Sequence, residues 1–249
     1  MEIDVEASAM DDRAAEAAAN VAARALDVWL ARGAVLAIVA LQILLVNDLS
    51  PIPRWILPAL EIALLAPLSI ATAWSLGTTK RVATADDPSD LWDMATRHRN
   101  AIRAAFLWLT GLVSVANLLS LNGLVAAILR GNAANGKSLL LDSLNIWATN
   151  LIIFALWYWH IDQRIPGGGE DPRPDFLFTQ QTLPASLTQP AYNPGFVDYL
   201  FLAFTNATAF SPSDTFPLTA RAKLLMMLQA LISLVTIALV AARAVGILA

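Results

Sequence analysis

The sequence predicts an all-α membrane protein with five transmembrane helices and a re-entrant half-helix before the last span. Of its 249 residues, 57% are hydrophobic and only 14% are charged, against about 25% charged in soluble domains. Apolar runs of about twenty residues, enough to cross a bilayer, recur along the chain. One further apolar segment is only about half that long and is bounded by turn-forming residues. The lipid bilayer is therefore the first expected partner.

Composition also excludes several functions. The chain has no cysteine, which rules out disulfides, thiolate metal sites and cysteine nucleophiles. With only His98 and His160, no metal site is expected, and no basic run points to nucleic acid. The "GGGE" stretch at Gly167 is not followed by a phosphate-binding helix start, and no nucleophile elbow occurs. We expect neither an enzyme nor a cofactor.

The first domain, residues 1–30, is acidic and rich in alanine. It lacks the basic start and compact apolar core of a cleavable signal peptide, so we expect it to be retained. Its good helix formers, with apolar residues at roughly helical spacing, predict a surface helix that leads into the membrane.

A four-span membrane region, residues 31–162, follows. The turn-rich "NDLSPIP" separates its first two spans, and a long polar connection separates the second from the third. The last span of the chain comes much later, after a polar loop and a short apolar segment. Apolar runs predict the five spans at residues 31–46, 55–76, 104–129, 141–161 and 222–248.

The region that interrupts this pattern consists of two more domains. Residues 163–195 form a proline- and glycine-rich loop that is too polar to cross a bilayer, and residues 196–249 hold a half-helix, a filter-like loop and the last span. "FVDYLFLAFTNATAF" is apolar for only ten to twelve residues; Asn193 and Gly195 break the chain before it, and Pro212 breaks it after. Irregular backbone at membrane depth is tolerated only inside protein or beside a water-filled cavity. This order therefore predicts a pore hairpin.

From Phe204 onward the chain resembles the pore loop of tetrameric potassium channels. An aromatic-rich helix ends in threonines, "AFSPS" stands in place of the filter, and an Asp, a "Pro-x-Thr" and a basic residue follow. The matching residues are Thr205, Thr208, Asp214, Pro217, Thr219 and Arg221. The resemblance implies a homotetramer that conducts monovalent cations, and one hairpin per chain cannot by itself enclose a pore.

The chain is also similar to a bacterial family of membrane proteins of unknown function. Members pair an aromatic, histidine-bearing span end, here "FALWYWHID", with a hairpin of the type "YLFLAFT" and "SDT". The similarity covers roughly Ile153 to Ile247. It implies a location in the bacterial inner (plasma) membrane.

The filter segment departs from the potassium-channel pattern because no glycine lies between Gly195 and Gly246. A ladder of inward backbone carbonyls needs glycine at unusual backbone angles, so side chains are expected to line the constriction instead. A ring of Asp214 carboxylates, one per subunit, would favour cations. The candidate selectivity residues are Thr205, Asn206, Thr208, Phe210, Ser211, Ser213, Asp214 and Thr215.

Other interpretations stay open for the hairpin. Its hydroxyls and amide can bridge helices, and Asp214 can cap the last helix, which describes a packing element in a non-conducting assembly protein. A stripe on the last span can line a water path or form a small-residue helix contact. That stripe consists of Ala230, Ser233, Thr236 and Val240.

Six further polar residues lie in apolar surroundings. Glu61 is a candidate ion or proton site, or the partner of a base such as Arg54 or Arg103. His160 follows "WYW", so an interfacial hydrogen bond or pH sensing is expected. Interhelical hydrogen bonds are expected of the remaining amides, Asn117, Asn122, Asn145 and Asn150.

Two signals disagree about membrane orientation. Basic residues cluster around the connection between the second and third spans, and the positive-inside rule places that connection and the N-terminus in the cytoplasm. With five spans, the hairpin then enters from the cytoplasmic side, whereas the potassium-channel resemblance implies the opposite. We expect the N-terminus inside. The basic residues are Lys80, Arg81, Arg97, Arg99 and Arg103.

Overall fold

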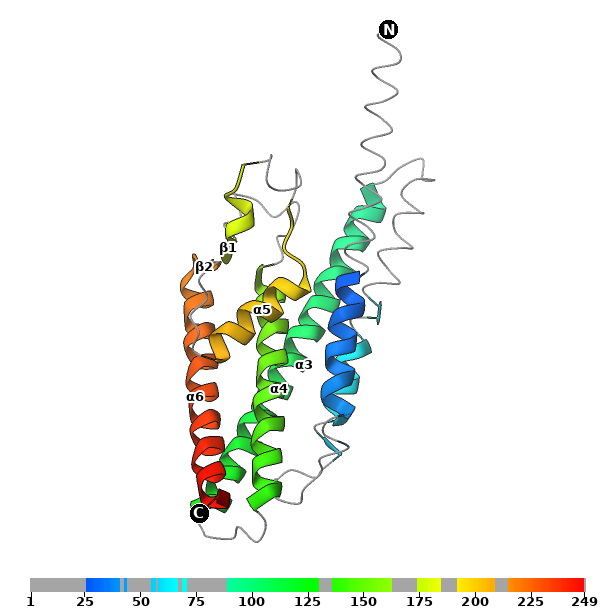
Figure 1. The fold of residues 1–249 in the computed structure, drawn as a ribbon. Helices are drawn as coiled ribbons and strands as arrows, with labels where there is room; N and C mark the ends of the chain where they lie inside the picture. Colours follow the sequence, from blue (N-terminus) through cyan, green and yellow to red (C-terminus); the bar gives the residue numbers. More distant parts are fainter. Residues whose placement is uncertain are drawn as a thin grey trace.

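The structure is a computed structural model of a mainly helical chain (Figure 1). Its principal helices are α3 (Ser89–Leu129), α4 (Gly136–Asp162), α5 (Phe196–Ala207) and α6 (Ala220–Leu248), and residues 26–40 and 58–66 are also helical. The structure describes residues 26–40, 43, 55–56, 58–66, 69–70, 89–129, 136–162, 174–184, 192–208 and 215–248.

Three helices are long and apolar enough to cross a membrane: Ala101–Leu129, Leu139–Asp162 and Ala220–Ala242. These stretches lie within α3, α4 and α6 and coincide with the third, fourth and fifth predicted spans. They identify the chain as a membrane protein. The first two predicted spans are described only in part, as the helical residues 26–40 and 58–66, and their crossing of the membrane remains a prediction.

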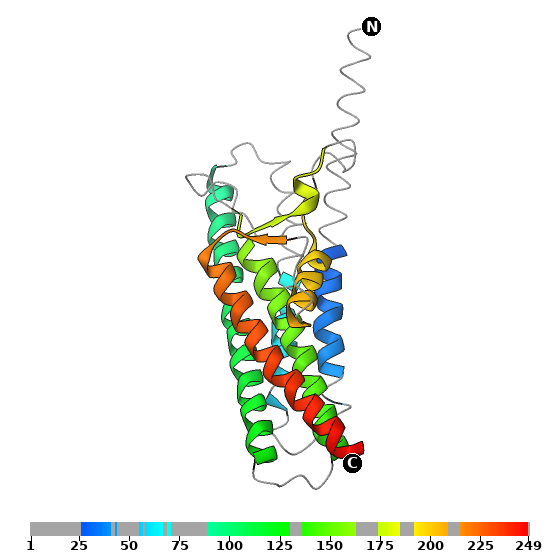
Figure 2. The same cartoon turned by 60° about the vertical axis from the view of Figure 1, so that its left-hand side comes forward.

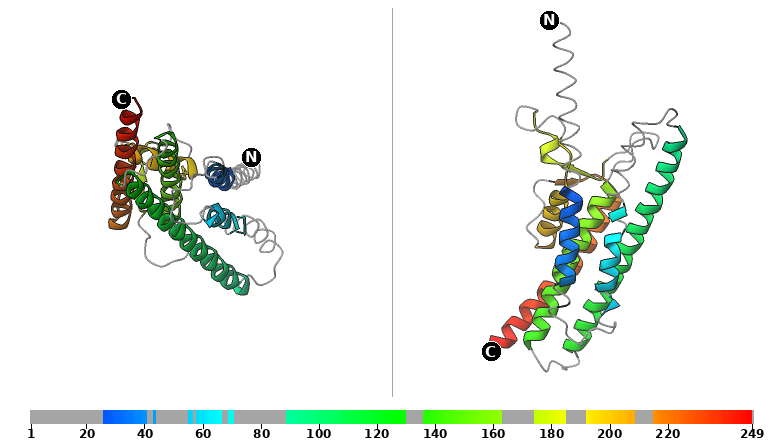
Figure 3. Two further views of the ribbon diagram at one scale, coloured as in Figure 1. Left: turned by 90° about the horizontal axis from the view of Figure 1, so that it is seen from below. Right: turned by 90° about the vertical axis from the view of Figure 1, so that its right-hand side faces the viewer.

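Helix α4 is the central helix of the bundle. In its most apolar stretch 56% of the residues are buried, against 28% in α3 and in α6. Seen from below, α4 lies between α6 on one side and the helix 26–40 on the other (Figure 3). Continuous burial near its C-terminal end explains why the "FALWYW" segment is apolar and aromatic on every face.

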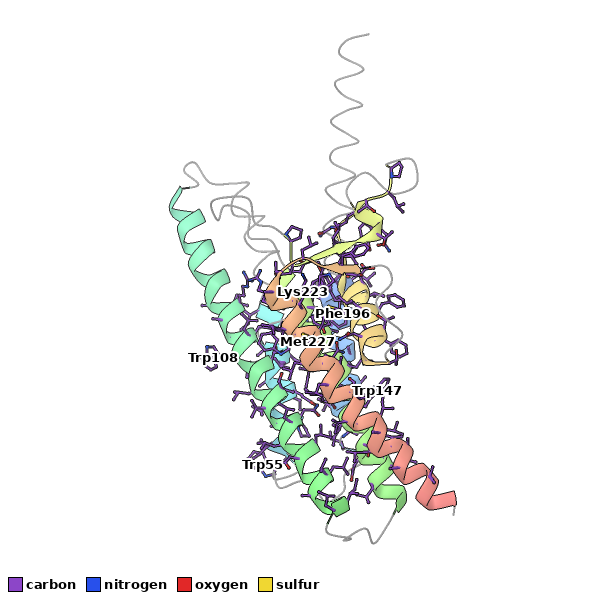
Figure 4. All side chains as sticks on the ribbon, turned by 90° about the vertical axis from the view of Figure 1, so that its left-hand side faces the viewer. Trp55, Trp108, Trp147, Phe196, Lys223 and Met227 are labelled. Atoms are coloured by element: carbon purple, nitrogen blue, oxygen red, sulfur yellow. The ribbon has the colours of Figure 1, made fainter. Side chains whose placement is uncertain are left out.

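The outer faces of α3 and α6 remain apolar. Trp108 is 75% exposed and points away from the other helices (Figure 4). On α6 the exposed residues recur at helical spacing, at Leu224, Met227, Leu231 and Leu234. Such surfaces suit contact with lipid tails or with another membrane helix.

Helix α5 has 12 residues, about 18 Å of length at 1.5 Å per residue, and is therefore too short to cross a bilayer. It packs against α4 and α6. Its first turn is closed by Asp198, whose Oδ2 accepts a hydrogen bond from the Gly195 amide at 2.7 Å. Its buried face is formed by Phe196, Tyr199, Leu202, Ala203 and Ala207, so the short apolar segment predicted from the sequence is a helix with one face in the core.

Two short strands join the segment before α5 to the segment after it. β1 (Phe176–Phe178) pairs antiparallel with β2 (Thr215–Pro217), with Leu177 opposite Phe216. They lie near the end of α4 and the start of α6 (Figure 2). The sequence predicts only a polar loop over residues 163–195, and β1 with the short 3-10 helix η1 (Thr179–Gln181) is an addition to that prediction.

Candidate functional site: the hairpin and its polar supports

The hairpin begins and returns at one end of the bundle. α5 starts beside the C-terminal end of α4 and ends partway along α6. β2 lies back at the starting end, and α6 then runs away from that end, antiparallel to α4 (Figures 1 and 2). Aromatic rings surround the start of α5: Trp159 meets Phe196 edge to face at 5.6 Å between ring centroids, and Phe178 meets Tyr199 at 5.2 Å. These contacts hold the N-terminal half of α5 against α4 and β1.

The C-terminal end of α5 is held by a hydrogen-bonded group that we call the inner network. It consists of Tyr158, Asn206 and Gln229. The Tyr158 hydroxyl donates to Gln229 Oε1 at 2.5 Å, and Asn206 Nδ2 donates to the same oxygen at 2.8 Å. Asn206 Nδ2 also lies 2.9 Å from the Met226 carbonyl, and Gln229 Nε2 donates to the Ala203 carbonyl at 2.8 Å. Three helices, α4, α5 and α6, are thereby tied at one point.

The inner network is uncharged; Tyr158 and Gln229 are buried, and Asn206 is half-buried. Tyr158 and Gln229 are both 0% exposed, and an unpaired polar group in such a place costs about 1–3 kcal/mol. Mutual satisfaction of the amides and the hydroxyl removes that cost. Asn206, expected at the constriction, is thus a residue whose amide is turned toward α4 and α6 of its own chain.

A second group, which we call the outer clasp, lies where β1, α4 and α6 meet and consists of Asp162, Asp175, Thr219 and Arg221. The Asp175 carboxylate, 1% exposed, accepts hydrogen bonds from Arg221 Nε at 2.6 Å, from Arg221 Nη2 in a salt bridge, and from the Thr219 hydroxyl. The Thr219 hydroxyl also accepts from the Ala222 amide at 3.3 Å, so it caps α6. The clasp joins the segment before β1 to the first turn of α6.

Asp162 completes the outer clasp from the end of α4. Its Oδ1 accepts hydrogen bonds from the backbone amides of Asp175, at 2.7 Å, and Phe176, at 3.1 Å. Its Oδ2 accepts the Tyr199 hydroxyl at 2.6 Å. One carboxylate therefore connects α4, the start of β1 and the first turns of α5.

A third contact joins the hairpin to the helix at residues 26–40, which we call the N-terminal helix. Asp27 Oδ1 accepts a hydrogen bond from the Phe196 amide at 3.0 Å. Burial raises the pKa of Asp27, the Phe196 amide opposes that rise, and the nearby Asp198 carboxylate adds to it. Burial, together with the hydrogen bond to Asp198, also raises the pKa of Tyr192.

The predicted selectivity residues are described only in part. Thr205 and Thr208 donate their hydroxyls to backbone carbonyls of α5 itself, each to Oi−4, at 3.0 Å and 2.9 Å, and Thr215 is buried in β2. The remaining members lie outside the described residues: Phe210, Ser211, Ser213 and Asp214.

The stripe on α6 faces α4. Ser233 is 1% and Thr236 0% exposed; Asn150 Nδ2 donates to Ser233 Oγ at 3.0 Å, and the Thr236 hydroxyl donates to the Ile232 carbonyl at 2.8 Å. Ala230 and Val240 beside them are half-buried. These contacts fit the helix-contact interpretation, and the Asn150 bond is of the interhelical kind that the sequence predicts.

The other polar residues predicted to lie in the membrane are buried as well. Glu61 is 2% exposed and Asn117 is 2% exposed, with Asn117 Nδ2 3.4 Å from the Ile146 carbonyl of α4. His160 is stacked on Phe106 at 3.6 Å between ring centroids. Arg103, a possible partner for Glu61, donates to the His160 carbonyl at 3.3 Å. His160 is therefore buried between α3 and α4, and its interfacial hydrogen bond and pH sensing remain predictions.

Several residues of the two groups are not predicted from the sequence. Gln229 offers a signal, since an amide in the middle of an apolar span needs a partner. Asp162 and Asp175 offer none, because both border a polar loop, where a carboxylate is ordinary, and their side-chain partners lie on α5 and α6. Among the described residues, no group of three or more His, Cys, Asp or Glu could hold a metal ion.

The comparisons with known proteins add no relative. No protein family, curated protein or solved structure matches this chain. Proposals about function therefore depend on the residues and contacts described above.

Proposed function

We propose that the chain is a subunit of a homotetrameric ion channel that conducts monovalent cations passively, with the C-terminal hairpin as its re-entrant pore loop. The observation that carries this proposal is the course of the chain around α5. A helix of 12 residues starts at one end of the bundle, stops partway along α6, and is followed by a strand back at the starting end (Figures 1 and 2). A half-helix of this kind is a way to bring polar backbone to membrane depth.

The inner network supports this role because it holds the lower end of α5 rigidly. A narrow conduction path requires that its lining residues keep their positions to within fractions of an ångström. Asn206 is bonded to α6 through Met226 and Gln229, directly before the residues proposed to form the constriction. In the proposal, Asn206 positions the constriction and does not line it.

Cation preference has two proposed sources. The C-terminal end of a helix carries partial negative charge, and α5 ends at Ala207, next to the proposed constriction. Asp214 would add one carboxylate per subunit, and the hydroxyls of Ser211 and Ser213 would replace water around the ion. This side-chain lining takes the place of a glycine-based potassium filter.

Assembly into a tetramer would cover surfaces that one chain leaves open. The outer face of α5 carries Val197, Phe201 and Phe204, which are 53%, 50% and 45% exposed. They follow one another at helical spacing, beside the exposed apolar face of α6. A ring of subunits would bury these residues and enclose the pore that a single hairpin cannot.

The same geometry bears on orientation. Arg103 is bonded to the His160 carbonyl, so basic residues of α3 lie at the end of the bundle where the hairpin opens. The positive-inside rule assigns such an end to the cytoplasm. We accordingly propose that the hairpin opens toward the cytoplasm, which is inverted relative to potassium channels, and that the protein resides in a bacterial plasma membrane.

A second candidate is a non-conducting membrane assembly protein in which the hairpin is a packing element. The observation that favours it is the use of hydroxyls: Thr205 and Thr208 are bonded to α5 itself, and Ser233 and Thr236 are buried against α4. These groups have their hydrogen bonds without water or ions.

Reconstituted liposomes distinguish the two candidates. We would measure potassium, sodium and chloride flux for the wild type, for Asp214→Asn, and for the charge-preserving control Asp214→Glu. Conduction through the hairpin predicts cation flux that Asn reduces relative to chloride and that Glu preserves. A folded protein without flux under every gradient would favour the second candidate, and flux with equal ion ratios in all three proteins would remove Asp214 from the path.

A further inference from the structure

The N-terminal helix and the half-helix meet at a contact that neither the hairpin's packing nor the conduction proposal explains. Asp27 and Phe196 are 169 residues apart, yet Asp27 Oδ1 accepts the Phe196 amide at 3.0 Å. Asp198 meanwhile accepts the neighbouring Gly195 amide at 2.7 Å. The amides of the N-cap residue Gly195 and of Phe196, the first residue of α5, have no partner inside the helix, and they are taken by one carboxylate from α5 and one from the helix at residues 26–40.

Gly195 adapts the backbone to this contact. A Cβ atom there would lie 2.5 Å from Asp27 Oδ1, closer than any real Cβ contact. The backbone at Gly195 has φ −92° and ψ 176°, which any L-amino acid adopts readily. Glycine is therefore needed at this position for space beside Asp27 and not for its conformational freedom.

We propose that Asp27 is a positioning residue that couples the N-terminal helix to the half-helix α5, and that its protonation state sets how firmly the two are held. The contact itself is independent of conduction; only its description as a control on a pore rests on the proposed function. Through this hydrogen bond, a force or a ligand that displaces the N-terminal helix would also displace the start of α5.

Within the described residues, two ionisable groups of the hairpin segment interact with Asp27. From α5 comes the Asp198 carboxylate, from the segment before α5 the Tyr192 hydroxyl, and both interact with Asp27 or with each other. On its own helix, Arg32 lies over the Trp29 ring at 5.0 Å. Two carboxylates thus share the first turn of α5, an arrangement in which a proton relieves repulsion.

The sign of the pH dependence follows from linkage. Burial and Asp198 raise the pKa of Asp27 in the docked state above its ordinary value, so docking is accompanied by proton uptake. Lowering the pH through the acidic range therefore strengthens the contact, and raising it weakens the contact. The protonated carboxyl still has an oxygen that accepts the Phe196 amide.

A disulfide tests the geometry, because the chain has no native cysteine. A Cβ on Gly195 would lie 3.1 Å from Asp27 Cγ, and adding one carbon–carbon bond of about 1.5 Å puts the two Cβ atoms within about 4.6 Å, near the limit for a disulfide. Asp27→Cys with Gly195→Cys should crosslink on mild oxidation. The control pair, Val28→Cys with Gly195→Cys, should not, since its side chain points to another face of the helix. No crosslink in the first, folded pair would overturn the proposal.

The role of the carboxylate is tested by thermal unfolding across a range of acidic to neutral pH. Asp27→Asn keeps an acceptor oxygen, so it should match the wild type at acidic pH and lose the pH dependence. Asp27→Ala should lower Tm by about 2–4 °C, the shift for loss of roughly one hydrogen bond. Equal effects of Asn and Ala, or an unchanged pH profile in Asn, would refute the coupling through Asp27.

Gly195→Ala supplies a second, independent measurement. It should lower Tm in the wild type, where its methyl meets Asp27, and should have little effect in the Asp27→Ala background, where that space is open. Additive effects would contradict the contact. Flux assays of the same variants separate the two proposals. A crosslink and non-additive Tm shifts without any flux support the coupling and refute conduction. Flux without a crosslink supports conduction and refutes the coupling.

Discussion

The inner network and the outer clasp support the same hairpin with different chemistry. Tyr158, Asn206 and Gln229 carry no charge and connect α4, α5 and α6; Tyr158 and Gln229 are buried, and Asn206 is half-buried. Asp162, Asp175 and Arg221 are ionisable and lie where α4 ends and α6 begins. Charges are expensive inside a bilayer, whereas neutral hydrogen-bonding groups there cost little once paired. The two groups thus hold α5 with neutral hydrogen bonds at its C-terminal end and with a carboxylate at its start.

The clasp also differs from an ordinary surface ion pair. The Arg221 side chain is 62% exposed, whereas that of Asp175 is 1% exposed. The carboxylate depends wholly on its donors, while the guanidinium can turn to water. We therefore expect the two groups to respond unequally to mutation, and the following predictions begin with the clasp.

The largest effect is expected from Arg221→Ala. Removing the guanidinium leaves the Asp175 carboxylate buried without its counter-ion, which typically costs about 3–5 kcal/mol. The free energy of unfolding in detergent, measured by denaturant titration, should fall accordingly. The double variant Arg221→Ala with Asp175→Asn should recover part of the loss, because the uncompensated charge is gone. A single Arg221→Ala that unfolds like the wild type would show that the clasp is only a surface contact.

A smaller effect is expected from Gln229→Leu in the inner network. This change leaves the Tyr158 hydroxyl, the Asn206 amide and the Ala203 carbonyl without their shared partner. A cost of about 1–3 kcal/mol follows, measurable in the same titration. Met227→Leu, on the exposed face of α6, is the control and should leave stability unchanged. If both variants behave alike, Gln229 is not a structural centre.

Tyr158→Phe should cost less, about 1 kcal/mol. The ring stays, and with it the edge-to-face contact to Phe176 at 5.2 Å between centroids. Only the hydroxyl that donates to Gln229 is lost, and Asn206 remains bonded to Gln229 and Met226. A loss as large as that of Gln229→Leu would mean that the hydroxyl, and not the amides, holds the network together.

The smallest effect is expected from Asn150→Ala and Ser233→Ala. A single hydrogen bond between membrane helices averages about 0.6 kcal/mol, and the two residues bond each other at 3.0 Å. A double-mutant cycle should therefore give a coupling energy of that size. If Ser233→Ala instead changed ion flux and left stability unchanged, that result would support the water-path interpretation of the α6 stripe and contradict the helix-contact interpretation.

The sequence predicts the helices better than the supports between them. Apolar runs locate α3, α4 and α6, and the break at Gly195 locates the start of α5, because hydrophobic length is a local property. The β1–β2 pair is not predicted, since "FLF" lies in a stretch rich in proline and glycine. Its partner "TFP" has no strand pattern of its own.

Residues of the candidate site are predictable from the sequence only where a polar residue stands among apolar neighbours. Asn206 and Gln229 stand out as amides among apolar residues, but nothing local pairs them with Tyr158, which is 48 residues from Asn206. The "WYW" that precedes His160 predicts its aromatic surroundings, but nothing local pairs its ring with Phe106 of α3, which stacks on it. Tertiary contacts of this kind arise from how helices cross, which no sequence spacing records.

The inner network has a consequence for biosynthesis. α6 follows α5 in the chain, so Met226 and Gln229 leave the ribosome only after the half-helix has been made. Until α6 is in the membrane, Asn206 and the Ala203 carbonyl lack the bonds that α6 supplies. The hairpin is therefore completed only once α6 has been inserted, and a nascent chain that stalls before α6 exposes an α5 whose polar groups lack their partners.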